Sequence, residues 1–314
     1  MKQALHYKDI CLVPRFNTLS SRSEADTAVD FLGKRYKLPV VPSNMKCVID
    51  SVRASWLSEN GYFYIMHRFG DTYAFVKDNQ HLEDVSISVG VKGSDVDLLK
   101  KIKSNGLRVD VITIDIAHGH SLAMRGMIDI IHTLFPHVSI IAGNVCTEEA
   151  VKDLHQWGAD CIKVGIGGGA PCSTKNKTGF TLPMYTCLTS IKPHRYGVPI
   201  IADGGVREHA DIAKAIHAGA TMVMAGSLFS KLIDSPAEIV NGHKVYYGSA
   251  SQFNKGEYKH VEGIKRTLDI DLMTYEEKLN EIKQDLQSAI SYAGGESLYD
   301  IREAKTYKVT NWEA

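Results

Sequence analysis

The segment best suited to chemistry is the glycine-rich run Gly165–Thr174, which contains one cysteine, Cys172. Glycine lets backbone N–H groups approach a ligand closely. A cysteine in such a loop can lie near a helix N-terminus or a bound cation, and either favours the reactive thiolate. Cys172 is therefore the candidate nucleophile. The alternative is a flexible loop that carries an incidental thiol.

Two further glycine motifs predict a phosphate site. Asp203-Gly204-Gly205 and Gly226-Ser227 each follow a short apolar run. Glycine amides and a serine hydroxyl can bind a phosphate without a full positive charge, and Asp203 can accept hydrogen bonds from ribose hydroxyls. An isolated Asp-Gly-Gly is also a common turn, so the prediction depends on the pairing of the two motifs.

A third polar segment, Asp115–His120, contains an aspartate and two histidines. Zinc sites use His-x-His spacing, which leaves a metal site open as an alternative. We interpret the segment instead as a polar surface for a second ligand. Asn44 and Met45 follow another apolar run and can contact a bound base.

The elements that position these residues are predicted by short apolar runs of strand length. Most runs are continuous rather than alternating, which is typical of strands buried on both faces. The predicted strands are Leu38–Pro42, Tyr62–Met66, Val85–Val91, Val111–Ile116, Val138–Ala142, Cys161–Val164, Val198–Ala202 and Thr221–Ala225.

Amphipathic helices are predicted between the strands. Thr147 can cap a helix that Gly158 ends, and Ser94–Gly106 and Arg207–Gly219 repeat the pattern. This alternation predicts an α/β fold, a (β/α)8 TIM barrel in a single domain over 1–314. All three glycine motifs then lie at the carboxyl ends of strands, where such barrels have their active sites. A doubly wound sheet is the alternative, but its usual glycine fingerprint after the first strand is absent.

The pattern changes after the last predicted strand. Ser249–Met273 is polar and aperiodic, so we predict a long active-site flap over 249–273. Tyr275–Ala293 then reads as a strongly amphipathic C-terminal helix that Gly294 and Gly295 end.

Composition narrows the functional class. The 314 residues contain 36 basic and 36 acidic side chains, which gives no electrostatic case for binding nucleic acid or a membrane surface. No run approaches the ~20 apolar residues of a membrane helix, and the start has no signal-peptide core. The six cysteines form no C-x-x-C pair, which argues against a zinc knuckle. We expect a cytoplasmic protein.

These motifs, in this order, resemble the IMP dehydrogenase/GMP reductase family over nearly the whole chain. The cysteine loop Gly165–Thr174 carries the resemblance, together with Tyr7–Pro14, Leu38–Met45, Asp203–Gly205, Gly226–Ser227 and Tyr247–Ser249. The segments Tyr64–Phe69, Thr113–Ser121, Ile141–Val145 and Gln284–Gly295 resemble the family's short bacterial reductase branch.

The resemblance implies NADPH-dependent reductive deamination of GMP to IMP through a thioimidate on Cys172. It implies that Thr174 and Glu262 help ammonia to leave, and that Asp203 holds the ribose. NADPH is expected near Asp115, Ala117, His118 and Gly119. The substrate-binding residues implied are Asn44, Met45, Gly167, Gly169, Asp203, Gly204, Gly205, Gly226, Ser227, Tyr247, Gly248 and Ser249.

The resemblance also implies a homotetramer and a potassium site at the carbonyls of Gly167, Gly169 and Cys172. The loop departs from the family pattern: Gly168 replaces a proline, Ala170 replaces a serine, and Pro171 precedes the nucleophile. One alternative is an IMP dehydrogenase without the CBS insertion, although 249–273 lacks the Arg-Tyr pair of those enzymes. The other is a purine-nucleotide-binding paralogue with impaired catalysis.

Overall fold

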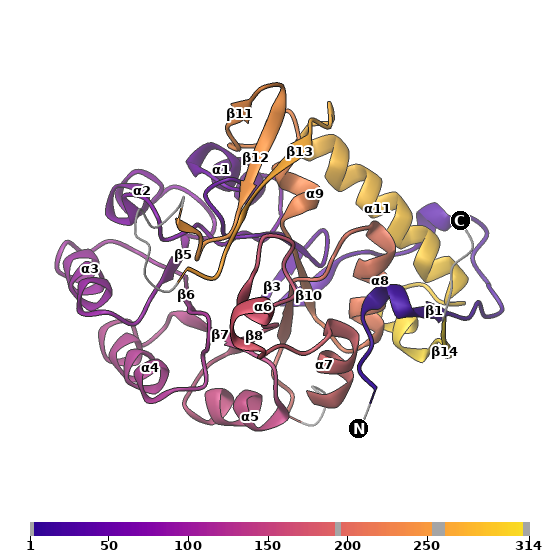
Figure 1. Ribbon diagram of the computed structural model, residues 1–314, viewed down its shortest axis with the longest axis horizontal. Coiled ribbons are helices and arrows are strands. Elements are labelled where there is room, and N and C mark those ends of the chain that lie inside the picture. The colour runs from indigo at the N-terminus through magenta and orange to yellow at the C-terminus, as the bar shows by residue number, and fades with distance from the viewer. Residues whose placement is uncertain (1–2, 192–195, 253–260, 310–314) are drawn as a thin grey trace.

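A seven-stranded parallel sheet forms the centre of the chain in the computed structural model, which describes residues 3–191, 196–252 and 261–309. The sheet is curled, and helices surround it (Figure 1). In spatial order its strands are β4 (Val40–Pro42), β10 (Met222–Ala225), β9 (Ile200–Asp203), β8 (Cys161–Val164), β7 (Ser139–Val145), β6 (Val111–Asp115) and β5 (Ser86–Val89). Seven of the eight predicted strands are present in this sheet, and they are buried because helices cover their outer face.

The predicted strand Tyr62–Met66 is reduced to one parallel bridge, between Met66 and Ile87 at the β5 edge. Its residues are nonetheless buried. The described residues thus form an α/β fold with a curled parallel sheet. Tyr62–Met66 adds to the β5 edge of this sheet only the bridge between Met66 and Ile87.

The covering helices alternate with the strands, as the sequence pattern predicts. Their bounds are α1 (Ser51–Glu59), α2 (Thr72–Asp78), α3 (Gly93–Ser104), α4 (Leu122–Leu134), α5 (Glu148–Gln156), α7 (Met184–Ile191) and α8 (His209–His217). The Thr147 side chain accepts a hydrogen bond from the Ala150 amide, which confirms the predicted cap of α5. None of the helices in the described ranges is long and apolar enough to cross a membrane.

The segment 249–273 is not wholly irregular, so that part of the prediction was wrong. It contains β13 (Lys265–Asp269), which pairs antiparallel with β12 (His243–Tyr247), and β12 in turn pairs with β11 (Ile239–Val240). Most side chains of β13 are exposed, so the strand lacks the apolar alternation by which a strand is recognised. Residues 253–260 of the predicted flap lie outside the described residues.

The remaining elements frame this core. The long helix α11 (Tyr275–Tyr292) confirms the predicted C-terminal helix, with Leu279, Ile282, Leu286 and Ile290 buried. Two small antiparallel pairs were not predicted, β1 (Ile10–Leu12) with β14 (Thr306–Lys308) and β2 (Val29–Phe31) with β3 (Lys34–Tyr36). Short helices complete the fold: α6 (Thr174–Thr178), α9 (Ser227–Ser230), and 3-10 turns at Tyr7–Asp9, Arg22–Glu24 and Leu298–Glu303.

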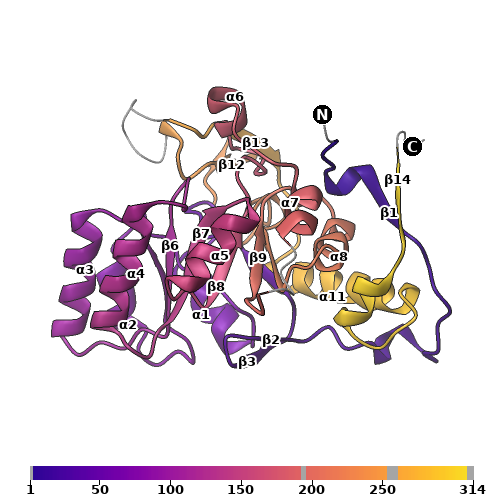
Figure 2. The same cartoon turned by 90° about the horizontal axis from the view of Figure 1, so that it is seen from below.

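The carboxyl ends of the parallel strands meet on one rim of the molecule. Figure 2 shows α6, β12 and β13 on this rim and the β2–β3 pair on the opposite side. The cysteine loop follows β8, and the two phosphate motifs follow β9 and β10. The fold therefore gathers the three predicted motifs on one rim.

Candidate active site

Cys172 lies at the start of a three-residue hydrogen-bond chain on the rim. Its Sγ donates to Oγ1 of Thr174 at 3.2 Å, and that hydroxyl donates to Oε2 of Glu262 at 2.5 Å. All three side chains line the same cavity, which has a volume of about 320 Å3. A thiol, a hydroxyl and a carboxylate in series can pass a proton in either direction, which nucleophilic and acid–base chemistry both require.

Glu262 is held in place by its backbone. The Ser173 amide donates to the Glu262 carbonyl at 2.7 Å, and the Ile264 amide donates to the Pro171 carbonyl at 2.8 Å. On the other side, the Glu262 amide donates to the Ala250 carbonyl. Residues 262–264 are therefore bonded on both sides, to the cysteine loop and to the chain that follows β12.

Gly263 makes this close packing possible. It forms bridges with both Cys172 and Ser251. A Cβ atom at position 263 would lie 2.7 Å from the backbone nitrogen of Ser251, a separation that real side chains do not tolerate. Any larger residue at this position would force the backbones of Gly263 and of Ala250 and Ser251 apart.

The two phosphate motifs lie directly beside the cysteine loop. Gly204 has a φ of +106°, and a Cβ there would lie 3.0 Å from the Gly169 backbone nitrogen. Gly226 and Ser227 follow β10, and the Tyr246 hydroxyl occupies the space where a side chain at position 226 would begin. The glycines thus let the two motifs, the cysteine loop and a tyrosine ring approach one another.

Lys163 forms the floor of the site. Its ammonium lies 2.8 Å from Oδ1 of Asp115 and 2.8 Å from Oδ2 of Asp203, and only 2% of its side chain is exposed. Asn44 donates to the other oxygen of Asp115 at 3.0 Å, and Asn144 donates to Asp203 at 2.8 Å. These side chains from five strand ends form one polar layer, in which both carboxylates are fixed.

The charges within this layer support one another. Burial raises the pKa of the Asp115 carboxyl, but attraction to Lys163 outweighs that effect and the net pKa falls below its ordinary value. Burial lowers the pKa of the Lys163 ammonium, yet the two carboxylates raise it well above its usual range. Asp115 and Lys163 are therefore both charged at neutral pH.

Most of the residues predicted for the site line this cavity. They are Asn44, Met45, Asp115, Ala117, Gly167, Gly169, Cys172, Thr174, Asp203, Gly204, Gly205, Gly226, Ser227, Gly248, Ser249 and Glu262. Three predicted residues lie outside the described lining. His118 is exposed on the rim, Gly119 is buried with its amide bonded to the Asn144 carbonyl, and Tyr247 is buried while its neighbour Tyr246 lines the cavity.

The histidines of the third polar segment do not converge on a metal site. His120 Nε2 lies 2.8 Å from the Asp153 carboxylate, and its ring packs near Trp157. Within the ranges that the structure describes, no three His, Cys, Asp or Glu side chains are grouped to hold an ion.

Among the lining residues that escaped the sequence analysis, four have charged or amide side chains: Arg68, Asn144, Lys163 and Arg207. Lys163 did carry a signal, because it is the one charged residue in the otherwise apolar run Cys161–Val164. A buried lysine needs carboxylate partners, and Asp115 and Asp203 end strands of the same sheet. The other three follow strands in polar segments and stand out only once the fold is known.

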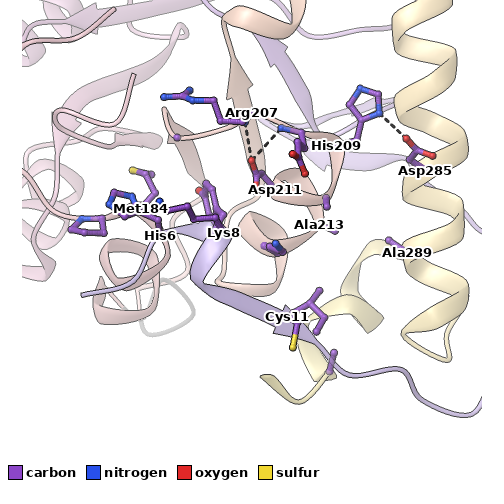
Figure 3. A pocket seen from close by; sticks show the side chains of 18 of the residues that line it. His6, Lys8, Cys11, Met184, Arg207, His209, Asp211, Ala213, Asp285 and Ala289 are labelled. Atoms are coloured by element: carbon purple, nitrogen blue, oxygen red, sulfur yellow. Dashed lines mark hydrogen bonds and ion pairs between the residues drawn. The ribbon is translucent and has the colours of Figure 1, made fainter. Parts of the chain in front are cut away.

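A larger cavity of about 1200 Å3 adjoins the site. It lies between the N-terminal segment, α8 and α11, as Figure 3 shows with His6, Arg207, Asp211 and Asp285. The two cavities share Gly167, Gly168, Gly205 and Arg207. Cys172, Thr174 and Glu262 line only the smaller one, so the chemistry is placed there.

Comparison with known proteins identifies close relatives. A family model described as the IMP dehydrogenase / GMP reductase domain matches residues 4–313. A GMP reductase of Acidovorax ebreus is 50% identical over 306 residues, which cover 95% of this chain and 93% of the relative. A GMP reductase of Staphylococcus carnosus is 48% identical over 314 residues, which cover 97% of this chain and 96% of the relative.

Proposed function

The chain belongs to the IMP dehydrogenase/GMP reductase family, and we propose that within it the chain catalyses the GMP reductase reaction, the NADPH-dependent conversion of GMP to IMP and ammonia. The observation that carries the proposal is the hydrogen-bond chain from Cys172 through Thr174 to Glu262. It supplies a nucleophile and a proton path at one point of the cavity. The family membership supplies the substrate class.

In the first step, Cys172 Sγ forms a bond to the purine carbon that carries the amino group, and the π electron pair of that carbon's ring C=N bond moves to the ring nitrogen, from which it re-forms the C=N bond when the amine leaves. The thiol proton moves to Thr174 as Thr174 passes its own proton to Glu262, in the direction of the two hydrogen bonds. Thiolates add to such carbons and leave again more readily than alkoxides do.

In the second step, the carbon–nitrogen bond breaks and the amine leaves. An amide anion is too basic to leave, so the amine must be protonated first. Glu262 returns the proton through Thr174 to this nitrogen, and ammonia departs. The proton lost by the thiol is thus the one that ammonia gains, and a thioimidate remains on Cys172.

NADPH, when bound, would supply the hydride that replaces sulfur at this carbon. The residues present fit a ligand on the Asp115 side of the cavity. Ala117 is exposed beside Asp115. Between Asp115 and Asp203, Asn144 bonds through its amide nitrogen to Asp203 and has a buried side-chain oxygen without a partner among the described residues, as expected of an atom that bonds a ligand in this cavity. Asp115, Ala117, His118 and Gly119 would hold the cofactor, and Cys172 leaves as a thiolate that is then reprotonated.

The opposite side of the cavity suits the nucleotide's sugar and phosphate. The rim after the last two strands is the usual phosphate site of barrels of this kind. Backbone amides and a hydroxyl are provided there by Gly205, Gly226 and Ser227. Lys163 and Asn144 both contact Oδ2 of Asp203, which leaves its Oδ1 for a ligand. That oxygen is suited to accept from the ribose.

Several finer features belong to the same proposal. We infer that Tyr62–Met66 closes the curled sheet into a single-domain (β/α)8 barrel, and that the protein acts in the cytoplasm. A homotetramer is part of the proposal on the family resemblance alone. A potassium site at the carbonyls of Gly167, Gly169 and Cys172 fits only in part, because the Gly169 carbonyl already accepts the Cys172 amide.

A spectrophotometric assay tests the proposal. We expect NADPH absorbance to fall when GMP is added, with one ammonia released for each NADPH oxidised. NADH formation from IMP and NAD+ would instead identify a dehydrogenase without CBS domains. GMP binding without turnover would identify a paralogue in which Gly168, Ala170 and Pro171 have impaired the loop.

A further inference from the structure

Some of the charged residues that line the reaction cavity form an ion pair or a side-chain hydrogen bond among the described residues, whereas others form no ion pair there. The charged lining residues are Arg68, Asp115, Lys163, Asp203, Arg207 and Glu262. Lys163 is bound to both aspartates, and the Glu262 carboxylate accepts from Thr174. The arginine ion pairs among the described residues involve Arg35, Arg53 and Arg108, so none includes Arg207.

Arg207 lies on the side of the cavity where a phosphate is expected. It comes two residues after Gly205, and it lines both cavities. Its backbone amide donates to Asp211, but the guanidinium extends away from that carboxylate (Figure 3). The guanidinium instead contacts two carbonyls, of Val206 at 3.1 Å and of Gly168 in the cysteine loop at 3.5 Å. Carbonyl contacts orient the charge without neutralising it.

The neighbourhood of Tyr246 supports the same placement. The Tyr246 hydroxyl packs against Gly226, in the second phosphate motif. Burial raises the pKa of this phenol, whereas the nearby Arg207 charge acts to lower it. Arg207 therefore lies within electrostatic range of the point where the motifs after β9 and β10 meet. Lys163, in contrast, is already bound to two carboxylates.

We propose that Arg207 is the cationic residue of a phosphate subsite, and that it selects the nucleoside 5′-monophosphate over the uncharged nucleoside. This inference rests on the proposed function. A 5′-monophosphate carries nearly two negative charges at neutral pH, and a guanidinium is the side chain best matched to phosphate oxygens. The amides of Gly205 and Gly226 and the Ser227 hydroxyl orient the phosphate, and Arg207 supplies the charge that they lack.

Binding titrations without cofactor test the inference. We compare Arg207→Met, Arg207→Gln and Arg207→Lys with the wild type, using GMP and guanosine as ligands. Arg207→Gln keeps an N–H donor for the Gly168 carbonyl but removes the charge. Lys214→Met is the matched control, because Lys214 lines only the larger cavity.

For an exposed charge-assisted contact, we expect Arg207→Met and Arg207→Gln to weaken GMP binding about 10-fold, with guanosine binding unchanged. Arg207→Lys should retain most of the GMP affinity. Added NaCl should weaken GMP binding by the wild type more than by Arg207→Gln. Equal weakening of GMP and guanosine would show a structural effect through Gly168 and overturn the inference, as would unchanged GMP binding. A wild type that binds guanosine but neither binds nor reduces GMP would refute the proposed function itself.

Discussion

Oγ1 of Thr174 lies 2.5 Å from Oε2 of Glu262, although 88 positions separate the two residues in the chain. The contact exists because residues 262–264 are bonded to the cysteine loop through their backbone. It places the threonine hydroxyl between a thiol and a carboxylate, as the proposed proton path requires. Cys172, Thr174 and Glu262 can each be substituted separately. The substitutions test the proton path and the nucleophile in turn.

Removing the proton path should slow the reaction without removing the nucleophile. We expect Thr174→Val and Glu262→Gln each to lower kcat with GMP and NADPH by about 10^2- to 10^4-fold, the usual contribution of acid–base catalysis. The affinity for GMP should stay within a few-fold of wild type, measured by titration without cofactor. Because the two residues act in series, the double variant should be little slower than either single variant. Additive losses would contradict a shared path.

Removing the nucleophile should abolish turnover. We expect Cys172→Ala to lower kcat by at least about 10^4-fold, as for other nucleophile deletions. The intact mass of the wild type incubated with GMP should reveal an adduct that Cys172→Ala lacks. Cys11→Ala is the control, because this thiol lines only the larger cavity. Full activity of Cys172→Ala would refute the covalent mechanism.

Lys163 should be needed for the fold as well as for the site. Lys163→Met leaves Asp115 and Asp203 without their shared cation in a buried layer, and breaking such a pair costs about 3–5 kcal/mol of unfolding free energy. Lys163→Arg should recover most of this loss. Urea denaturation followed by tryptophan fluorescence gives the measurement. Lys152→Met on the exposed face of α5 is the control, and a loss as small as that of Lys152→Met would argue against a shared ion pair.

His67 should make stability depend on pH. Burial, and secondly the charge of Lys46, lower its pKa to about 4, and its Nδ1 accepts from the Phe69 amide. The unfolded chain takes up a proton near the ordinary histidine pKa of about 6.5, whereas the folded chain does not. This histidine therefore costs no stability above about pH 6.5 and progressively more as the pH falls toward 4.

His67→Asn keeps an acceptor for the Phe69 amide but does not titrate in this window. We expect the variant to lose less unfolding free energy than wild type between pH 7 and pH 4.5, measured from urea midpoints. The exposed His137→Asn should not change the pH profile. Parallel profiles for wild type and His67→Asn would show that folding does not lower the pKa of His67.

The sequence predicts well those elements whose residues face one environment along their whole length. Cys161–Val164 is buried at every position, and β8 has the predicted bounds. Thr147 is followed by two glutamates and an apolar stripe, and it caps α5 as expected. Local preference and burial agree in these segments, so the pattern is sufficient.

Contacts between segments that are distant in the chain are harder to predict from the sequence. β13 is exposed and is held by its partner β12, so its own residues give little indication of a strand. The family resemblance implied a role for Glu262, but its backbone link to the cysteine loop depends on Gly263, which no periodic pattern marks. Arg207 follows an expected motif, yet its orientation away from Asp211 is a property of the folded turn.

Residues 262–264 form backbone hydrogen bonds to two segments, the cysteine loop and the chain after β12. These bonds affect how the chain between residues 251 and 262 tolerates changes of length. The Glu262 amide bonds to Ala250, and Gly263 bridges to Ser251, so the intervening stretch starts and finishes at adjacent points. The entropy of closing such a stretch rises slowly with its length, by about 0.6 kcal/mol for each doubling. Insertions or deletions between 252 and 261 should therefore leave the proton path in register. The residues of the proton path and the length of chain between these two anchoring points can therefore vary independently.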